Sequence, residues 1–245
     1  KEPEIAAVYP TGIHGAIAEE LAPNTDFAIR TATLAEPSHG LTDEVLESTD
    51  VLIWWGHMGH HLVDDAIVEK VQQQVLSGMG IIVLHSGHYS KIFRKLMGTN
   101  CSLTWREANE KERLWVVEPA HPVMAGVPAY IELPAEEMYG ERFDVPTPEH
   151  VLMLSWFQGG EVFRSCATWQ RGHGKVVYLR PGHEEYPTYR NEHIVRIIAN
   201  AVRWSARRVR IATNDAPNVA SLEPVPGASK RATEAAKANS SSVGN

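Results

Sequence analysis

Two continuous apolar runs constrain the fold of this chain more than any other feature of its sequence. Residues 51–55 (VLIWW) end at Gly56, and residues 80–84 (GIIVL) end at His85. Continuous apolar runs of this length, without polar alternation, are typical of strands that are buried on both faces of a parallel sheet. Residues 63–76 lie between them and carry apolar side chains at helical spacing. This strand–helix–strand order predicts parallel strands joined by a right-handed crossover.

The rest of the chain extends this pattern into a larger α/β domain. Further helices are predicted at residues 13–21, 41–48, 90–97 and 192–207, and further strands at residues 27–34 and 175–179. Between residues 102 and 178 the pattern changes to short strands, predicted at residues 103–105, 114–117, 130–133, 151–157 and 161–169, with a hairpin turn at Gly159-Gly160. The predicted fold class is therefore α/β: an open, mostly parallel sheet flanked by helices, with an inserted antiparallel β section.

The last 34 residues, Ala212 to Asn245, differ in composition from the rest of the chain. They contain no aromatic residue and are rich in Ala, Ser, Pro, Asn and Lys. Such a segment buries too little apolar surface to offset the entropy that is lost on ordering. We therefore predict one folded domain over residues 1–211 and a disordered tail over residues 212–245.

Composition and charge exclude several classes of protein. The chain has 23 Lys and Arg against 30 Asp and Glu, a net charge of −7, whereas nucleic-acid binding needs a basic face. No apolar run approaches the roughly 18–20 residues that cross a bilayer, and the start at Lys1 shows no signal-peptide pattern. Cys101 and Cys166 form no CxxC motif. We expect a reduced, cytoplasmic protein without nucleic-acid or membrane partners.

Histidine is frequent, with 12 residues, and it is concentrated where predicted strands end. His57 and His60 follow the first apolar run, His85 and His88 follow the second, and His183 follows the last predicted strand. In an open α/β sheet, ligands bind outside the carboxyl ends of the strands. We therefore predict that these histidines line one cleft, although any one of them alone is more often a hydrogen-bonded structural residue.

Three features of this cleft leave alternatives open. His57 and His60 form an H-x-x-H pair that could hold a divalent metal, zinc or manganese, but the spacing is loose and no H-E-x-x-H motif is present. Glu137 could orient an imidazole or act as a general base, and a solvated acidic loop is an equal alternative. Trp54 or Trp55 could line the cleft against a sugar ring, although core packing is the commoner use of either residue.

Motifs for covalent catalysis and phosphate binding are absent from the sequence. Ser86 follows a strand but lies in no G-x-S-x-G motif, and both cysteines fall away from the predicted strand ends. Neither a P-loop nor a G-x-G-x-x-G fingerprint occurs. Imidazole, with an ordinary pKa near 6.5, can take and give protons at neutral pH. The sequence therefore favours acid–base chemistry over a thiol nucleophile.

Five segments, taken in order, resemble the trehalose-utilisation (ThuA-like) family. They are residues 8–14 (VYPTGIH), 54–58 (WWGHM), 83–88 (VLHSGH), 137–141 (EMYGE) and 178–184 (YLRPGHE). The resemblance covers about residues 5–206 and implies a flavodoxin-like sheet similar to class I glutamine amidotransferases, without their cysteine. It places His85 near the position of that cysteine, and His183-Glu184-Glu185 at the strand end that carries the amidotransferase His and Glu. Family members usually begin with a strand ahead of Tyr9, so the first strand is expected to be missing here.

The resemblance implies a bacterial protein of carbohydrate catabolism whose substrate is a disaccharide or a 3-keto-sugar. His85, His183 and Glu137 are the predicted catalytic residues, acting by acid–base chemistry that a divalent metal could assist. The predicted substrate-binding residues are His57, His88, Trp55, Tyr139 and Glu184. A functional link to a sugar oxidoreductase and a homo-oligomeric state are further expectations. The alternative is a non-catalytic sugar-binding or regulatory module on an amidotransferase-like scaffold that lacks the nucleophilic cysteine.

Overall fold

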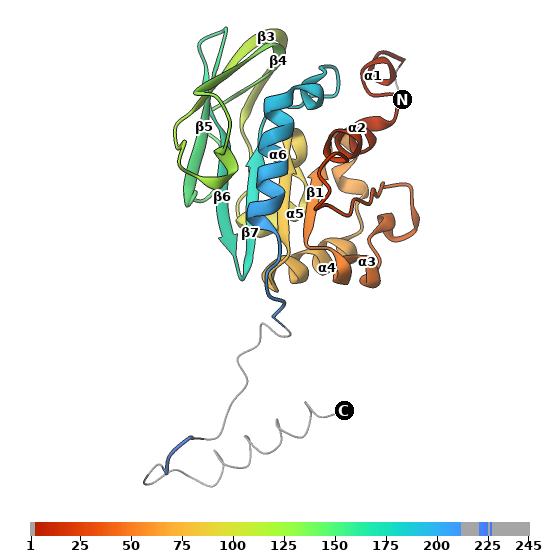
Figure 1. Cartoon of the computed structure of the whole chain (residues 1–245), viewed down its shortest axis with the longest axis vertical. Coiled ribbons are helices and arrows are strands. Elements are labelled where there is room, and N and C mark those ends of the chain that lie inside the picture. Colours follow the sequence, from red (N-terminus) through yellow and green to blue (C-terminus); the bar gives the residue numbers. More distant parts are fainter. Residues whose placement is uncertain (1–2, 212–220, 225, 227–245) are drawn as a thin grey trace. The chain divides into compact units, whose positions relative to one another are not determined.

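A single mixed sheet organises the computed structural model, which describes residues 3–211, 221–224 and 226. Within these residues seven strands pair in the order β1-β2-β7-β6-β5-β3-β4 (Figure 1). Their bounds are β1 Val51–Trp55, β2 Gly80–Leu84, β3 Thr104–Val116, β4 Tyr130–Gly140, β5 His150–Phe157, β6 Val162–Arg171 and β7 Gly174–Leu179. The described residues up to 211 form one compact unit of contacts. The predicted tail from residue 212 lies almost entirely outside the described residues.

The sheet has a parallel part and an antiparallel part. Strands β1, β2 and β7 run parallel, with Leu84 of β2 opposite both Trp55 and Leu179, so their carboxyl ends meet at one edge. Strands β3, β4, β5 and β6 pair antiparallel, and β6 joins them to β7. The predicted α/β class with an inserted antiparallel section is confirmed. The predicted hairpin is also present, because Gly160 donates its N–H to Phe157 O at 2.8 Å.

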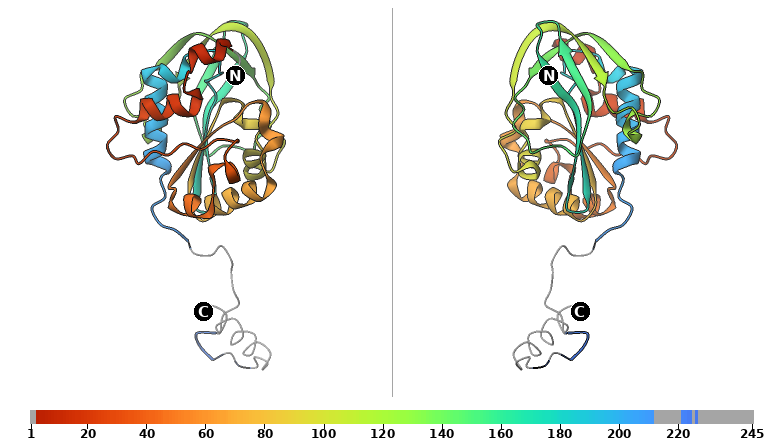
Figure 2. Two further views of the ribbon diagram at one scale, coloured as in Figure 1. Left: turned by 90° about the vertical axis from the view of Figure 1, so that its right-hand side faces the viewer. Right: turned by 90° about the vertical axis from the view of Figure 1, so that its left-hand side faces the viewer.

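Helices cover both faces of the parallel part (Figure 2). One face carries α2 and α6, and the other carries α3, α4 and α5. Their bounds are α1 Pro3–Val8, α2 Gly12–Leu21, α3 Asp43–Ser48, α4 Asp65–Leu76, α5 Lys91–Met97 and α6 Glu192–Ser205, with 3₁₀ helices at η1 Pro37–Gly40, η2 Met58–Leu62, η3 His85–Tyr89, η4 Pro122–Met124 and η5 Thr188–Arg190.

Alternating side chains of the central strands explain why their apolar runs are continuous. Ile82 of β2 and Val177 of β7 pack in the core beneath α2 and α6. Their neighbours Ile81 and Val176 pack in the opposite core, beneath α4 and α5. All four side chains are fully buried. A polar residue at any of these positions would have to be buried without water, which costs free energy unless it finds a partner.

The structure departs from the predicted elements at two places. Residues 27–33 form no strand, and β1 at the edge of the sheet pairs with β2 alone among the described strands. The predicted strands at 103–105 and 114–117 are parts of the single strand β3, and β4 continues to Gly140 rather than ending at residue 133. This second departure matters for the site, because it places Glu137 and Tyr139 on a strand.

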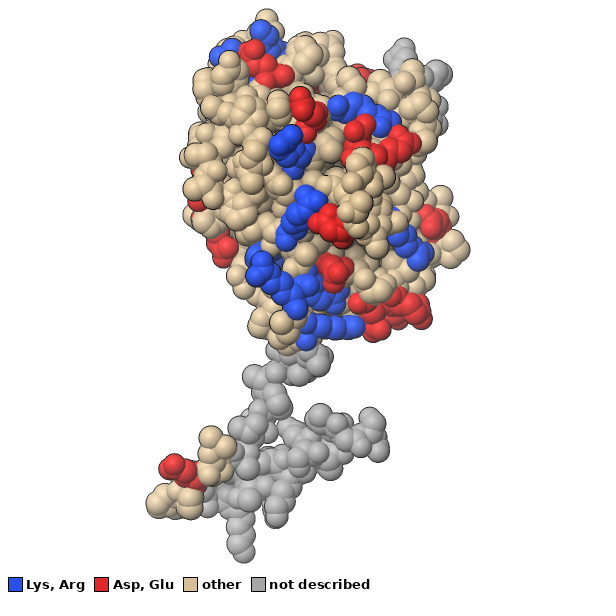
Figure 3. Space-filling view, viewed as in Figure 1, with Lys and Arg blue, Asp and Glu red and all other residues tan. Residues whose placement is uncertain are grey.

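The surface over α6 carries interleaved charges of both signs (Figure 3). Arg203 pairs with Asp26 at 2.8 Å, and Arg190 pairs with Glu19 at 2.7 Å. On the face shown, the described Lys and Arg side chains therefore lie among carboxylates instead of forming a uniform basic field. None of the described helices has the length and apolar character of a membrane span.

Candidate functional site

Three histidines meet at the carboxyl edge of the parallel strands. His57 follows β1, His85 opens η3 directly after β2, and His183 lies four residues beyond the end of β7. The ring centroids of His57 and His183 are 5.7 Å apart, and those of His85 and His183 are 5.4 Å apart. The structure thus brings together the three strand ends that the sequence singled out, with the ring of His183 near both others.

Strand β4 adds a carboxylate and a phenol from the antiparallel part. Glu137 Oε2 lies 3.0 Å from His85 Nε2, and the Tyr139 ring stacks on His85 with centroids 5.0 Å apart. All three side chains are buried, His85 completely. His85 and Glu137 are called the inner pair below. The alternative of a solvated acidic loop does not hold for Glu137, which is only 5 % exposed.

The contacts of the inner pair fix which nitrogen of His85 faces Glu137. His85 Nδ1 lies 2.9 Å from the carbonyl oxygen of Arg180, so it carries hydrogen and donates to that carbonyl. Nε2 therefore turns either a lone pair or a second proton toward Glu137. Burial alone would raise the pKa of Glu137, but contacts with His85, together with the charges of His183 and Arg180, hold it below its ordinary value. These contacts favour the ionised form of Glu137 beside His85 Nε2.

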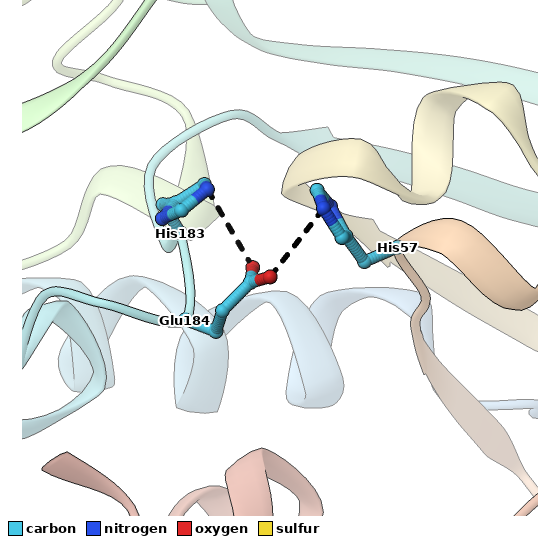
Figure 4. Close-up of side chains that lie close together, drawn as sticks. All are labelled: His57, His183 and Glu184. Carbon is cyan, nitrogen blue, oxygen red and sulfur yellow. Dashed lines mark ion pairs between the residues drawn. The ribbon is translucent and has the colours of Figure 1, made fainter. Parts of the chain in front are cut away.

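A second group of ligands lies toward solvent from the inner pair. His57 Nε2 is 3.4 Å from Glu184 Oε1, and His183 Nε2 is 3.7 Å from Glu184 Oε2 (Figure 4). These three residues are called the outer cluster. The His57 side chain is 31 % exposed, whereas those of His183 and Glu184 are 5 % and 11 % exposed. The outer cluster is therefore open on the side of His57.

A buried ionic network positions the segment that carries His183 and Glu184. Arg180 forms an ion pair with Glu112 and lies 3.4 Å from Glu136, and all three side chains are fully buried. Glu136 Oε1 in turn accepts hydrogen bonds from the Gly182 N–H at 3.1 Å and from the Thr188 hydroxyl. Arg180, Glu112 and Glu136 are called the Arg180 network. It fixes both ends of residues 180–188, with the two site residues between them.

Close packing also restricts this segment at Gly182. Its φ is 127°, a conformation that L side chains rarely adopt, and an added Cβ would lie 2.1 Å from the hydroxyl oxygen of Tyr189. Trp55 Nε1 donates to the Gly182 carbonyl at 3.2 Å, and the Trp55 ring stacks on His57 at 6.3 Å. The structure therefore places Trp55 in the wall of the site, in contact with both strand ends.

Two other predicted histidines lie apart from the outer cluster. His88 Nδ1 contacts the Cys101 carbonyl at 2.8 Å, and burial lowers the pKa of His88 to about 4. His60 packs edge-on against Tyr89, and burial likewise lowers its pKa to about 4. Among groups of described residues whose ligand atoms lie within 4.8 Å of one another, His57 occurs with His183 and Glu184, and His60 occurs in none.

Both cysteines are buried free thiols outside the site. Burial raises the pKa of Cys101 to about 11 and that of Cys166 to about 12. Because the thiolate is the nucleophilic form, neither side chain is prepared for covalent chemistry at neutral pH.

Sequence reasoning missed four residues that shape this site: Ser86, Glu107, Glu112 and Glu136. Ser86 accepts from His57, and Glu107 lies 3.9 Å from His183. The only sequence signal was the position of Ser86 directly after His85. Glu112 and Glu136 lie outside the predicted strands, and their burial depends on pairing between β3 and β4.

Comparisons with known proteins agree on the fold. A family model described as trehalose utilisation (ThuA) matches residues 9–205. A ThuA-like protein from Parabacteroides merdae is similar with a TM-score of 0.61 at 14% identity, over 83% of this chain and 87% of that chain. A cytoplasmic protein from Salmonella typhimurium is similar with a TM-score of 0.58 at 14% identity, over 79% and 87%. A search of curated proteins gave no significant match. At these identities the structural likenesses show the fold alone.

Proposed function

The chain belongs to the trehalose-utilisation (ThuA) family, and on this premise we propose that it is an enzyme that acts on a disaccharide or a 3-keto-sugar by acid–base chemistry. Membership of the family supports a carbohydrate-related role. The finer assignment rests on the inner pair, with His183 as the neighbouring imidazole.

The single observation that carries this proposal is the 3.0 Å contact between His85 Nε2 and Glu137 Oε2. The carbonyl of Arg180 accepts the Nδ1 hydrogen of His85 and fixes the ring, so Nε2 faces the carboxylate of Glu137. A pair that holds one proton between two groups can give it to a sugar oxygen and take another from a carbon next to a ketone. Isomerisation or elimination beside a ketone requires both steps.

The surrounding residues fit a substrate with hydroxyl groups. Glu184 accepts hydrogen bonds and His57 can donate or accept them, so both suit sugar hydroxyls. The half-buried ring of Trp55 offers an apolar surface beside them. A 3-keto-sugar would be supplied by an oxidoreductase that oxidises the corresponding hydroxyl, and such an enzyme is the proposed functional partner.

One observation favours a second candidate function, a sugar-binding module without catalysis. His85 has no exposed surface, so a substrate reaches it only if neighbouring side chains move. A module of this kind would use the more exposed outer cluster for binding and leave the inner pair as a structural element.

A turnover and binding assay separates the two functions. The protein is incubated with trehalose and with 3-keto-trehalose, and products are followed by NMR while binding is measured by calorimetry. We expect turnover of the keto-sugar, with kcat lowered at least about 10²-fold in His85→Asn and Glu137→Gln. The matched control is His150→Asn, because His150 lies on β5 and pairs with Glu118 away from the site. Binding without turnover would favour the module, and full activity in His85→Asn would exclude the inner pair.

A further inference from the structure

The outer cluster has the composition of a metal site. We propose that His57, His183 and Glu184 bind one divalent transition-metal ion at the carboxyl edge of the parallel strands. This proposal does not depend on the sugar chemistry proposed above, because metal binding is measured without any substrate.

The distances within the outer cluster suit a single ion. Zinc lies about 2.0–2.2 Å from nitrogen and oxygen ligands, which places two such ligands roughly 3–3.5 Å apart. Glu184 Oε1 is 3.4 Å from His57 Nε2, and Glu184 Oε2 is 3.7 Å from His183 Nε2. The three ligand atoms all lie within 4.8 Å of one another. Figure 4 shows the carboxylate between the two rings, so a small contraction would bring all three onto one ion.

The charge around His183 also favours a cation. Carboxylates of Glu107, Glu137 and Glu184 face its ring, the first at 3.9 Å from Nε2. The guanidinium of Arg180 is engaged by the Arg180 network. Glu184 Oε2 is buried and has no hydrogen-bond partner. A buried carboxylate oxygen without a partner costs free energy, and a bound cation would remove that cost.

One of the two imidazoles is already oriented for ligation. The Ser86 hydroxyl donates to the Gly56 carbonyl at 2.7 Å, so its oxygen accepts from His57 Nδ1 at 3.2 Å. In neutral His57 the proton is then on Nδ1, and the Nε2 lone pair faces Glu184. Metal-binding histidines commonly have such a partner on the second ring nitrogen.

The other imidazole has to give up one contact. His183 Nδ1 accepts the N–H of Glu185, which places the ring proton on Nε2 in the neutral form. Ligation through Nε2 requires the proton to move to Nδ1. The contact to be lost is long, at 3.3 Å, so the exchange is a small cost beside a bond to the metal.

Two other groups of ligands share His183, and both fit less well. In the group with His85 and Glu137, His85 has no exposed surface, so an ion reaches it from solvent only if neighbouring side chains move. In the group with Glu107 and Glu185, the carboxylates are exposed, the Glu107 side chain by 45 %. The outer cluster combines a buried carboxylate oxygen with a partly exposed imidazole that Ser86 holds for ligation, so an ion can reach it from solvent.

The donor set selects the metal. Two imidazole nitrogens and one carboxylate oxygen suit zinc, manganese or iron, whereas magnesium and calcium prefer oxygen ligands. Three protein ligands leave at least one open coordination position, and the exposure of His57 places it toward solvent. A ketone or hydroxyl of a substrate could occupy that position.

Calorimetric titration of the full chain tests the proposal. The protein is treated with EDTA, dialysed, and titrated separately with Zn²⁺, Mn²⁺ and Mg²⁺. We expect one equivalent of Zn²⁺ or Mn²⁺ to bind, and Mg²⁺ to bind at least about 10²-fold more weakly. His57→Asn, His183→Asn and Glu184→Gln should each weaken binding at least about 10²-fold. Ser86→Ala should weaken it about 10-fold, as loss of a ligand's orienting partner does.

The matched controls are His60→Asn and His61→Asn, which remove neighbouring histidines and should leave the affinity unchanged. Circular dichroism of each variant establishes that it is folded, and Glu184→Gln keeps the shape of the side chain if a histidine variant does not fold. Absence of stoichiometric binding would overturn the proposal, as would equal affinity in Glu184→Gln. Loss of binding in His60→Asn would overturn this ligand set in favour of the H-x-x-H pair.

Discussion

Residues 180–184 contribute to two groups of charged residues, the Arg180 network and the outer cluster, which differ in how their charges are balanced. In the Arg180 network the guanidinium compensates two carboxylates, and Ser155 and Thr188 donate further hydrogen bonds to them. No member of it has exposed side-chain surface. In the outer cluster the contacts are 3.4 Å and 3.7 Å long, and one buried carboxylate oxygen has no hydrogen bond. In the first group a permanent cation balances the carboxylates, although Arg180 Nε has no hydrogen bond. In the second group the carboxylate faces only imidazoles.

Arg180 connects the two groups. Its side chain belongs to the Arg180 network, while its backbone carbonyl accepts the proton of His85 Nδ1. The closed network therefore holds the ring of the inner pair in place. Buried ionic groups seldom add stability over apolar groups of the same size, but they can hold a chain in one conformation. Here they hold the backbone at Arg180, whose carbonyl positions the ring of His85. The comparison predicts that substitutions in the network act on stability and substitutions in the outer cluster act on binding.

The largest expected effect is on folding, from Arg180→Met. Without the guanidinium, Glu112 and Glu136 are left buried without a cation, which typically costs about 3–5 kcal/mol. Urea denaturation should show a loss of that size, or no folded protein. Arg190→Met is the control, because its partners Glu19 and Glu20 lie at the surface. Equal losses in both variants would remove the distinction between the network and surface pairs.

Metal should stabilise the protein by the next largest amount, through the outer cluster. A ligand at 100 times its Kd adds about 2.7 kcal/mol to the free energy of unfolding. We expect a rise of this order with Zn²⁺ in the unsubstituted chain and none in His183→Asn, measured by urea denaturation with and without EDTA. A rise that survives in His183→Asn would place the metal elsewhere in the molecule.

The two groups also differ in how far the sequence predicts them. His57, His85 and His183 could be predicted, because each follows a strand whose apolar run is continuous, and parallel strands end at one edge. Glu112 could not, because it lies outside the predicted strands and a carboxylate normally faces solvent. Its burial depends on β3 pairing with β4 and β5 at once, with β-bulges that shift the register.

The remaining differences between the predicted and the observed elements concern where strands end and which strands pair. Glu137 was predicted in the site, but outside a strand, because the strand before it was predicted to end at residue 133. The structure carries β4 through to Gly140, next to the end of β3. The predicted strand at 27–34 has suitable residues but no strand beside it. Pairing partners far away in sequence decided both outcomes, and local patterns carry no information on them.

A smaller effect on stability is expected from Thr188→Val. The hydroxyl donates to Glu136, which keeps the Gly182 N–H and Arg180 as partners. Loss of one such bond costs about 1–2 kcal/mol. Hydrogen exchange should show faster opening of residues 180–188 in this variant, with the helix α6 unchanged. Unchanged exchange in the segment would mean that Glu136 does not anchor it.

The smallest effect is expected from Glu184→Gln in the absence of metal. It is compared with Glu136→Gln, the matching substitution in the Arg180 network. Glu184→Gln removes a buried charge that has no hydrogen bond at Oε2, so the free energy of unfolding should stay within about 0.5 kcal/mol of the parent or rise slightly. Glu136→Gln removes a charge that Arg180 compensates, so it should lower stability by about 1–3 kcal/mol. Both substitutions keep the size of the side chain, and urea denaturation in EDTA compares them directly. If Glu184→Gln were as destabilising as Glu136→Gln, the Glu184 carboxylate would already stabilise the fold without a bound ion. The outer cluster would then be a second structural network.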